Sequence, residues 1–240
     1  MRRHQILVCL LLFISSNVNA QIKDTLRRER TISAFILPAS LIVGGLYAIT
    51  DNDILGREEI REERNEHYYN FHVTADDYLQ FAPLSLAFLM KTIGIEGRHD
   101  WFNSISLLLK SELLMGALVY TGKTLTAVPR PDTGSLNSFP SGHTAQAFMA
   151  ATYLHKEFGR GRPYVTIVGY TLATSVGVLR VMNDRHWASD VLVGAGIGVL
   201  STNLVYLTHK RKNKLKTSNT LVSPIYVPKG MGIGLTISLK

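Results

Sequence analysis

Six apolar stretches recur along this 240-residue chain, and they limit its fold more than any other feature. The stretches are roughly Ile32–Ile49, Tyr78–Ile95, Trp101–Thr121, Thr144–Leu154, Tyr164–Leu179 and Val191–Leu207. A helix needs about 20 apolar residues to cross a bilayer. We therefore predict an all-α fold, a six-helix membrane-embedded bundle. Because some stretches are short or carry polar residues, such as Lys110 and Glu112, a helical protein that only partly enters the membrane is the open alternative.

Two segments outside these stretches have other patterns. Charged residues interleave at helical spacings from Arg57 to Arg64, which is typical of a solvated helix. Beyond the basic tail His209–Lys216, apolar residues alternate with Gly, Thr, Ser and Lys from Met231 to Leu239, which is strand periodicity. With Pro228-Lys229-Gly230 as a turn, the end of the chain predicts a short C-terminal β-hairpin.

The first twenty residues have the pattern of a secretory signal peptide. Basic Arg2 and Arg3 precede an apolar run from Ile6 to Ile14, and small residues end the segment at Ala20. An uncleaved N-terminal anchor is the alternative. The single cysteine, Cys9, lies inside this run, so a cleaved chain would have no thiol for catalysis, disulfides or metal binding.

Basic residues outnumber acidic residues by 26 to 18, and the formal net charge is +8. An excess spread over many segments suits anionic lipid headgroups. No RNA- or DNA-binding motif accompanies it. We therefore expect the membrane as a partner and no nucleic acid, while the sequence indicates no oligomeric state.

Three polar segments connect the apolar stretches: Lys123–Pro131, Phe139–His143 and Arg180–Asp190. Lys123, Arg130 and Arg180 are cations near helix ends, where a charge is costly unless it is exposed or paired. One phosphate group would pair all three, because guanidinium and ammonium groups suit its oxygens. The alternative is that each cation reaches the lipid headgroups separately.

Ser141, Gly142 and His143 precede the fourth apolar stretch. The backbone N–H groups of a helix N-terminus lack partners within the helix, and they suit a phosphate. Gly142 lets the backbone approach an oxygen closely, and Ser141 adds a hydroxyl donor. The alternative is a plain helix start with Ser141 as its cap.

His186 and Asp190 are four residues apart, so they share a face if the helix has begun. A carboxylate there can hold one imidazole nitrogen and leave the other free as a nucleophile. His143 could protonate the leaving oxygen. Such pairs are also common in structural and metal sites, but a metal needs more ligands than these segments supply, so we expect no metal and no cofactor.

Taken in order, the three segments resemble the signature of the type 2 phosphatidic acid phosphatase family. That family shares its catalytic core with vanadium haloperoxidases and soluble bacterial acid phosphatases. Its signature is Lys, six residues, Arg-Pro; then Pro-Ser-Gly-His; then Ser-Arg, five residues, His, three residues, Asp. The resemblance covers roughly Asp76–Leu207. One departure is Leu179, which stands where the family has Ser and puts substrate preference in doubt.

The resemblance implies a role for each matching residue. Lys123, Arg130 and Arg180 would bind the phosphoryl oxygens, and Ser141 and Gly142 would donate to them. His143 would be the general acid, His186 the nucleophile and Asp190 its orienting partner. The implied domains are 1–20 signal peptide, 21–75 first apolar helix and charged connection, 76–208 phosphatase core, and 209–240 basic tail and hairpin, with the active site at the helix ends.

The family and the apolar stretches together favour a membrane lipid phosphatase. It would resemble bacterial enzymes that dephosphorylate lipid A, undecaprenyl diphosphate or phosphatidylglycerol phosphate. A soluble periplasmic acid phosphatase and an inactive binding protein on the same fold are the alternatives. A haloperoxidase would normally need a longer chain.

The positions of basic residues predict the orientation of the chain. They gather at Lys23–Arg30, Lys91–Arg98, Lys156–Arg162 and Lys210–Lys216, on one side of a six-span arrangement, with the three polar segments opposite. The positive-inside rule then places the site on the periplasmic side of a bacterial inner membrane. A cleaved signal followed by six full crossings would place it inside, so one apolar stretch must fail to cross.

Overall fold

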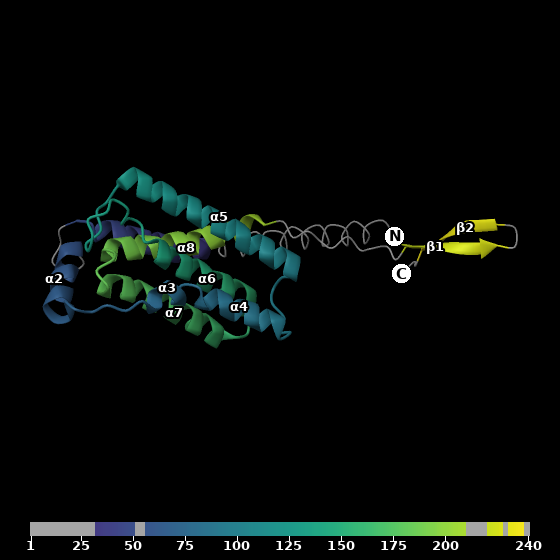
Figure 1. The fold of residues 1–240 in the computed structure, drawn as a ribbon, viewed down its shortest axis with the longest axis horizontal. Helices are drawn as coiled ribbons and strands as arrows, with labels where there is room; N and C mark the ends of the chain where they lie inside the picture. The colour runs from purple at the N-terminus through teal and green to yellow at the C-terminus, as the bar shows by residue number, and fades with distance from the viewer. Residues whose placement is uncertain (1–31, 51–55, 210–219, 228–229, 238–240) are drawn as a thin grey trace, which may run out of the picture. The chain divides into compact units, whose positions relative to one another are not determined.

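Helices make up nearly all of the computed structural model, which describes residues 32–50 and 56–209 and the backbone of 220–227 and 230–237. The helices are Ile32–Tyr47, α2 (Arg57–Tyr68), α3 (Ala75–Leu79), α4 (Ala82–Thr92), α5 (Trp101–Thr126), α6 (Gly142–Phe158), α7 (Pro163–Met182) and α8 (Ala188–Thr208) (Figure 1). The all-α prediction is confirmed for this part of the chain. The predicted signal peptide and the basic segments 23–30 and 210–216 lie outside the described residues.

The predicted count of six spanning helices is not confirmed. Of the described helices, α5, α7 and α8 are long and apolar enough to cross a membrane, and Ile32–Tyr47 is a shorter apolar helix. The predicted stretch Tyr78–Ile95 is two helices, α3 and α4. Pro83 is the reason, because it fits the first turn of α4 but would clash with the carbonyl one turn back in a continuous helix.

α6 lies at the centre of the helical unit and packs against α4, α5, α7 and α8. Its contact with α8 is close because two glycines of α8 face the backbone of α6. A Cβ at Gly194 would lie 2.5 Å from the carbonyl oxygen of Ser141, the N-cap of α6, and one at Gly198 would lie closer still to the carbonyl oxygen of Ala145. This packing fixes the N-terminus of α6 beside the start of α8.

The chain divides into two units, Met1–Thr208 and His209–Lys240. In the second unit, β1 (Thr220–Val227) pairs antiparallel with β2 (Gly230–Ile237). Thr220 lies opposite Ile237, and Val227 lies opposite Gly230.

Candidate active site

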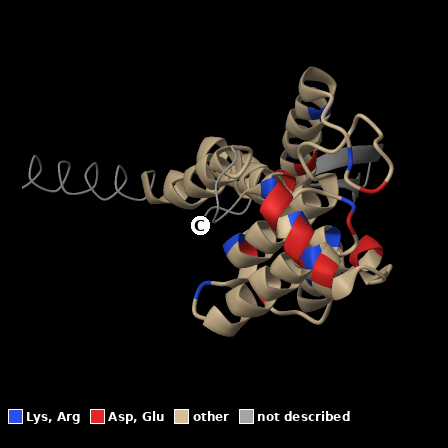
Figure 2. Cartoon of the chain, turned by 90° about the vertical axis from the view of Figure 1, so that its left-hand side faces the viewer, with Lys and Arg blue, Asp and Glu red and all other residues tan. Residues whose placement is uncertain are grey.

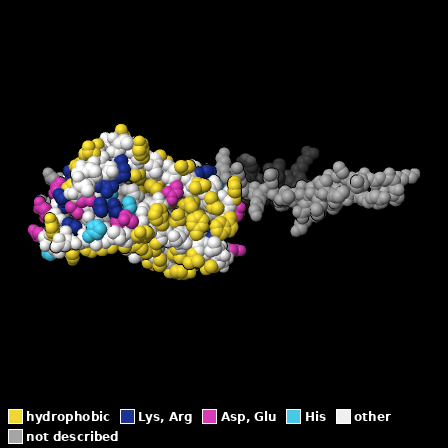
Figure 3. Space-filling model, viewed as in Figure 1, with side chains coloured by type: hydrophobic (Ala, Val, Ile, Leu, Met, Phe, Trp, Pro, Cys, Tyr) yellow, Lys and Arg dark blue, Asp and Glu magenta, His cyan; other side chains and the backbone are white. Residues whose placement is uncertain are grey.

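The three polar segments meet at one end of the helical unit. Two of them connect the end of α5 to the start of α6, and the third connects the end of α7 to the start of α8. Figure 2 looks onto this end and shows basic and acidic residues together on its loops and helices. Figure 3 shows basic side chains and histidines gathered there, with hydrophobic side chains over much of the rest of the described face.

His186 and Asp190 form a buried pair. The Nδ1 atom of His186 lies 3.4 Å from Oδ2 of Asp190, and each side chain is 1% exposed. The Asp190 carboxylate also accepts hydrogen bonds from the Ser138 hydroxyl and from the backbone N–H of Trp187. α8 begins only at Ala188, so the two residues do not share a helix face as the spacing suggested. A loop before the helix brings His186 to the carboxylate.

This environment keeps the His186 imidazole neutral. Burial lowers the pKa of His186 to about 4, and the Asp190 carboxylate only partly opposes that shift. The Arg130 and Arg180 guanidinium groups lower it further. With Nδ1 directed at Asp190, Nε2 is the nitrogen left for a reacting group.

The three predicted cations converge on this pair. Lys123 lies within electrostatic range of Arg130, Arg180 and Asp190. Its ammonium group donates to the backbone carbonyls of Asn137 and Ser138, and Arg130 Nε donates to Oδ1 of Asn137 at 2.7 Å. Burial and the neighbouring Arg180 lower the pKa of Arg130. Cations this close together, in a site that desolvates them, are suited to a multiply charged anion.

Arg180 is 5% exposed, and its Nη1 lies 2.7 Å from Oδ2 of Asp76. Its Nε is buried without a hydrogen-bond partner among the described residues. Buried donors are rarely left unsatisfied, so this N–H is available to a ligand oxygen. Asp76 holds the guanidinium in place.

Ser141 caps α6, as the alternative interpretation of the sequence proposed. Its Oγ accepts a hydrogen bond from the backbone N–H of Thr144 at 3.5 Å and lies 2.9 Å from the Thr144 hydroxyl. Its own N–H donates to the backbone carbonyl of Asp190 at 3.0 Å. The cap and the phosphate cradle are compatible, because the N–H groups of Gly142 and His143 in the first turn have no carbonyl one turn back.

His143 contacts an acidic residue that the sequence reasoning missed. Its Nε2 lies 3.0 Å from Oδ1 of Asp77, and the same oxygen lies 3.4 Å from Nη1 of Arg180. Burial and Arg180 lower the pKa of His143, while Asp77 and Asp76 oppose the shift. The sequence did offer a signal for this contact, because the adjacent acidic residues Asp76 and Asp77 directly precede the apolar stretch Tyr78–Ile95.

The sequence reasoning also missed the role of α2, which was interpreted as a solvated helix. Arg61 donates to both carboxylate oxygens of Asp184 at 3.2 and 3.3 Å, and to the carbonyl of Pro131 at 2.7 Å. Its guanidinium also lies over the Trp187 ring, 5.3 Å from the centroid. Arg64 donates to the carbonyl of Met182. α2 therefore ties the loop of His186 to the loop of Arg130.

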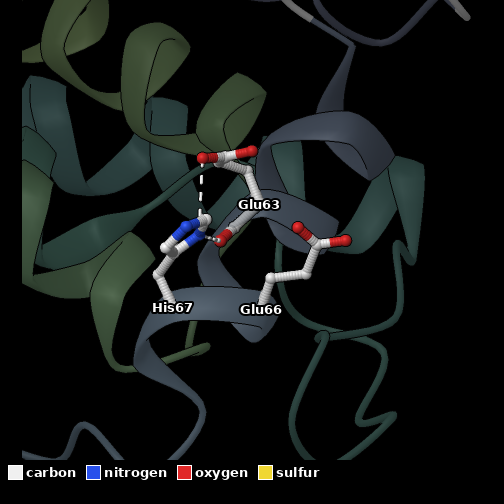
Figure 4. Close-up of side chains that lie close together, drawn as sticks. All are labelled: Glu63, Glu66 and His67. Atoms are coloured by element: carbon white, nitrogen blue, oxygen red, sulfur yellow. Dashed lines mark hydrogen bonds and ion pairs between the residues drawn. The ribbon is translucent and has the colours of Figure 1, made fainter.

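One group of possible metal ligands occurs in the described part of the chain, on the exposed side of α2. Ligand atoms of Glu63, Glu66 and His67 lie within 4.8 Å of one another. Figure 4 shows His67 in contact with Glu63, and its Nδ1 lies 3.4 Å from the Glu63 carboxylate and 3.1 Å from the Glu63 carbonyl. These are ordinary contacts of residues four apart on a helix surface, so we assign no metal site here.

Part of this chain is similar to known proteins. Residues 104–214, which contain all eight predicted site residues, match the PAP2 superfamily. Lipid A 1-phosphatase of Porphyromonas gingivalis is 38% identical over 185 residues, which cover 77% of this chain and 38% of the relative's length.

Two crystal structures are similar to part of this chain. Aquifex aeolicus LpxE is 23% identical with a TM-score of 0.47, over 60% of this chain and 93% of that one. A transmembrane PAP2 type phosphatidylglycerolphosphate phosphatase from Bacillus subtilis is 24% identical with a TM-score of 0.42, over 71% of this chain and 94% of that one.

Proposed function

The chain belongs to the PAP2 superfamily through its domain at residues 104–214, and on that premise we propose that it is a membrane lipid phosphatase. Its reaction is hydrolysis of a lipid phosphomonoester or diphosphate through a phosphohistidine intermediate. The observation that carries the proposal is the buried His186–Asp190 pair beside three converging cations. A neutral imidazole next to an anion site is a nucleophile placed for phosphoryl transfer.

The reaction proceeds in two balanced steps. Nε2 of His186 attacks phosphorus, the bond from phosphorus to the leaving oxygen breaks, and His143 gives that oxygen its proton. Water then attacks phosphorus, the P–N bond breaks, and His143 takes a proton from the water. Lys123, Arg130, Arg180 and the first-turn N–H groups of α6 stabilise the charge on the phosphoryl oxygens throughout.

The surface around the site favours a lipid over a soluble phosphate ester. On α5, which ends at the site, Leu113 is 74% exposed, Tyr120 is 70% exposed and Leu125 is 80% exposed. Large exposed apolar patches mark surfaces that contact a membrane or another protein, and α5 is long and apolar enough to cross a membrane. Of the candidate substrates lipid A, undecaprenyl diphosphate and phosphatidylglycerol phosphate, the similarity to a lipid A 1-phosphatase favours the lipid A type.

The proposed location is the bacterial inner membrane, with the site facing the periplasm and residues 1–20 acting as a signal peptide. Two basic segments support this orientation, because Lys91–Arg98 begins in the last turn of α4 and Lys156–Arg162 begins in the last turn of α6, at the helix ends away from the site. Cytoplasmic loops carry an excess of Lys and Arg.

The proposal predicts metal-independent phosphate release from lipids. Purified protein in detergent is assayed on a panel of lipid phosphates with excess chelator, with and without vanadate. We expect turnover in chelator, because the cations already supply the charge that a metal would supply. Millimolar vanadate should inhibit, since its adduct with His186 resembles the transition state. Activity only on soluble esters, or activity that requires a divalent ion, would contradict the proposal.

A second prediction concerns Arg61, the residue of α2 that joins the two catalytic loops. Arg61→Met should lower kcat about 10- to 100-fold on lipid and aryl phosphates alike, because small displacements of reacting groups are costly. The matched control is Glu62→Gln, the exposed next residue of α2, which should stay near the wild-type rate. A wild-type kcat in Arg61→Met would show that the two loops keep their geometry without this contact.

A further inference from the structure

A polar pair lies below the phosphate site, inside the apolar part of the helical unit. Gln146 Nε2 on α6 donates a hydrogen bond to Oε1 of Glu112 on α5 at 2.7 Å, and both residues are half-buried. Gln146 is one turn after His143, which is about 4.5 Å further along the helix. Glu112 is eleven residues, about three turns, before Lys123 and so lies on the same strip of α5.

The side of α5 between Glu112 and Lys123 is exposed at Gly116 and Tyr120, while Val119 on the same strip is buried in the core. α4 and α5 both pack against α6, but no Cα of α4 lies within 8 Å of a Cα of α5. At Gly116, one turn beyond Glu112, an added Cβ would meet no atom within 4 Å. A lipid held by its phosphate at Lys123 and His143 can therefore extend along this strip toward Glu112.

The Glu112 carboxylate has an oxygen that accepts no hydrogen bond from the described residues. Gln146 occupies one oxygen of Glu112, and among the described residues Oε2 of Glu112 has no hydrogen-bond partner. An ionised carboxylate only accepts hydrogen bonds. A carboxylate within a membrane helix is costly, and such residues mark binding sites and pathways more often than simple helix contacts.

We propose that Glu112 and Gln146 form an acceptor subsite for hydrogen-bond donors in the part of the substrate that extends from its phosphate along α5 toward Glu112. The inference rests on the proposed function and narrows the substrate class. A phosphate on an N-acylated sugar carries amide N–H and hydroxyl donors at that depth. A diacylglycerol phosphate carries ester carbonyls there, which only accept hydrogen bonds and gain nothing from a carboxylate.

The test is the ratio of kcat/KM for an N-acylated sugar phosphate lipid to that for phosphatidic acid, both in mixed micelles. We expect the wild type to favour the sugar lipid by about 10-fold or more, since hydrogen bonds to charged groups are strong. Glu112→Leu should lower the ratio about 10-fold. Glu112→Gln, which keeps the shape and an acceptor oxygen, should lower it less and serves as the variant if Glu112→Leu does not fold.

Two controls separate this subsite from the phosphate site. Lys110→Met removes an exposed charge from the same part of α5 and should leave the ratio unchanged. Turnover of a small aryl phosphate, which does not reach Glu112, should be unchanged in every variant. If the wild type hydrolyses both lipids and folded Glu112 variants keep its ratio, the subsite is wrong while the lipid phosphatase stands. If the wild type hydrolyses no lipid phosphate, both proposals fail.

Discussion

We expect His186→Ala to abolish turnover and to leave no phosphoenzyme to trap. The substitution removes the atom that would bond to phosphorus. Losing a covalent nucleophile costs about four orders of magnitude or more in rate. The measurement is rapid mixing with labelled substrate and a base quench, because phosphohistidine survives base. The wild type should show a labelled enzyme, and His186→Ala should show none with lipid or aryl phosphate.

Asp190→Asn is the graded control for this experiment. The amide keeps the size of the side chain but removes the charge that supports the imidazole, and it disturbs the hydrogen bonds from Ser138 and Trp187. Its rate should fall between wild type and His186→Ala, with some labelled enzyme still formed. A labelled enzyme in His186→Ala would place the covalent bond on another residue, even if the protein proves to be a phosphatase.

The sequence was sufficient to predict the helical class and the positions of the three polar segments. Each segment is short and chemically distinctive. Because its residues lie at the ends of apolar helices, antiparallel packing of those helices brings the three segments close to one another. The helix boundaries were less predictable. Pro83 divides one predicted stretch into α3 and α4, and His186 precedes its helix rather than lying within it.

The contacts of the supporting acidic and basic residues were not predictable, because their partners are distant in sequence. Asp76 meets Arg180 across 104 residues, and Arg61 meets Asp184 across 123. Nothing local distinguishes Arg61 from the other charged residues of α2. Its role depends on which face of α2 meets the loops, and only the folded arrangement determines that.

His143→Ala should separate substrates by their leaving groups. A lipid sugar oxygen is a poor leaving group and needs a proton as it departs, so phosphorylation of the enzyme by a sugar phosphate lipid should slow about 10²- to 10⁴-fold. An aryl phosphate leaves without that proton, so it should phosphorylate the variant at nearly the wild-type rate. The labelled enzyme should then accumulate, because the attacking water also lacks its base. Base-quenched labelling with both substrates measures this step.

The pH profile provides an independent check on the same role. Because burial and Arg180 lower the pKa of His143 below its ordinary value of 6.5, its acid form is lost at lower pH than in a free histidine. With the lipid substrate, kcat/KM should therefore fall as pH rises through that pKa, and on the acidic side it should fall near pH 4, where His186 is protonated. Asp77→Asn removes a carboxylate that raises the pKa of His143, so the decline of kcat/KM at the high-pH side of the profile should move to lower pH. Two results would assign the proton transfer to another group. One is an equal loss of phosphorylation rate with both substrates in His143→Ala, and the other is a high-pH decline of kcat/KM that stays unchanged in His143→Ala.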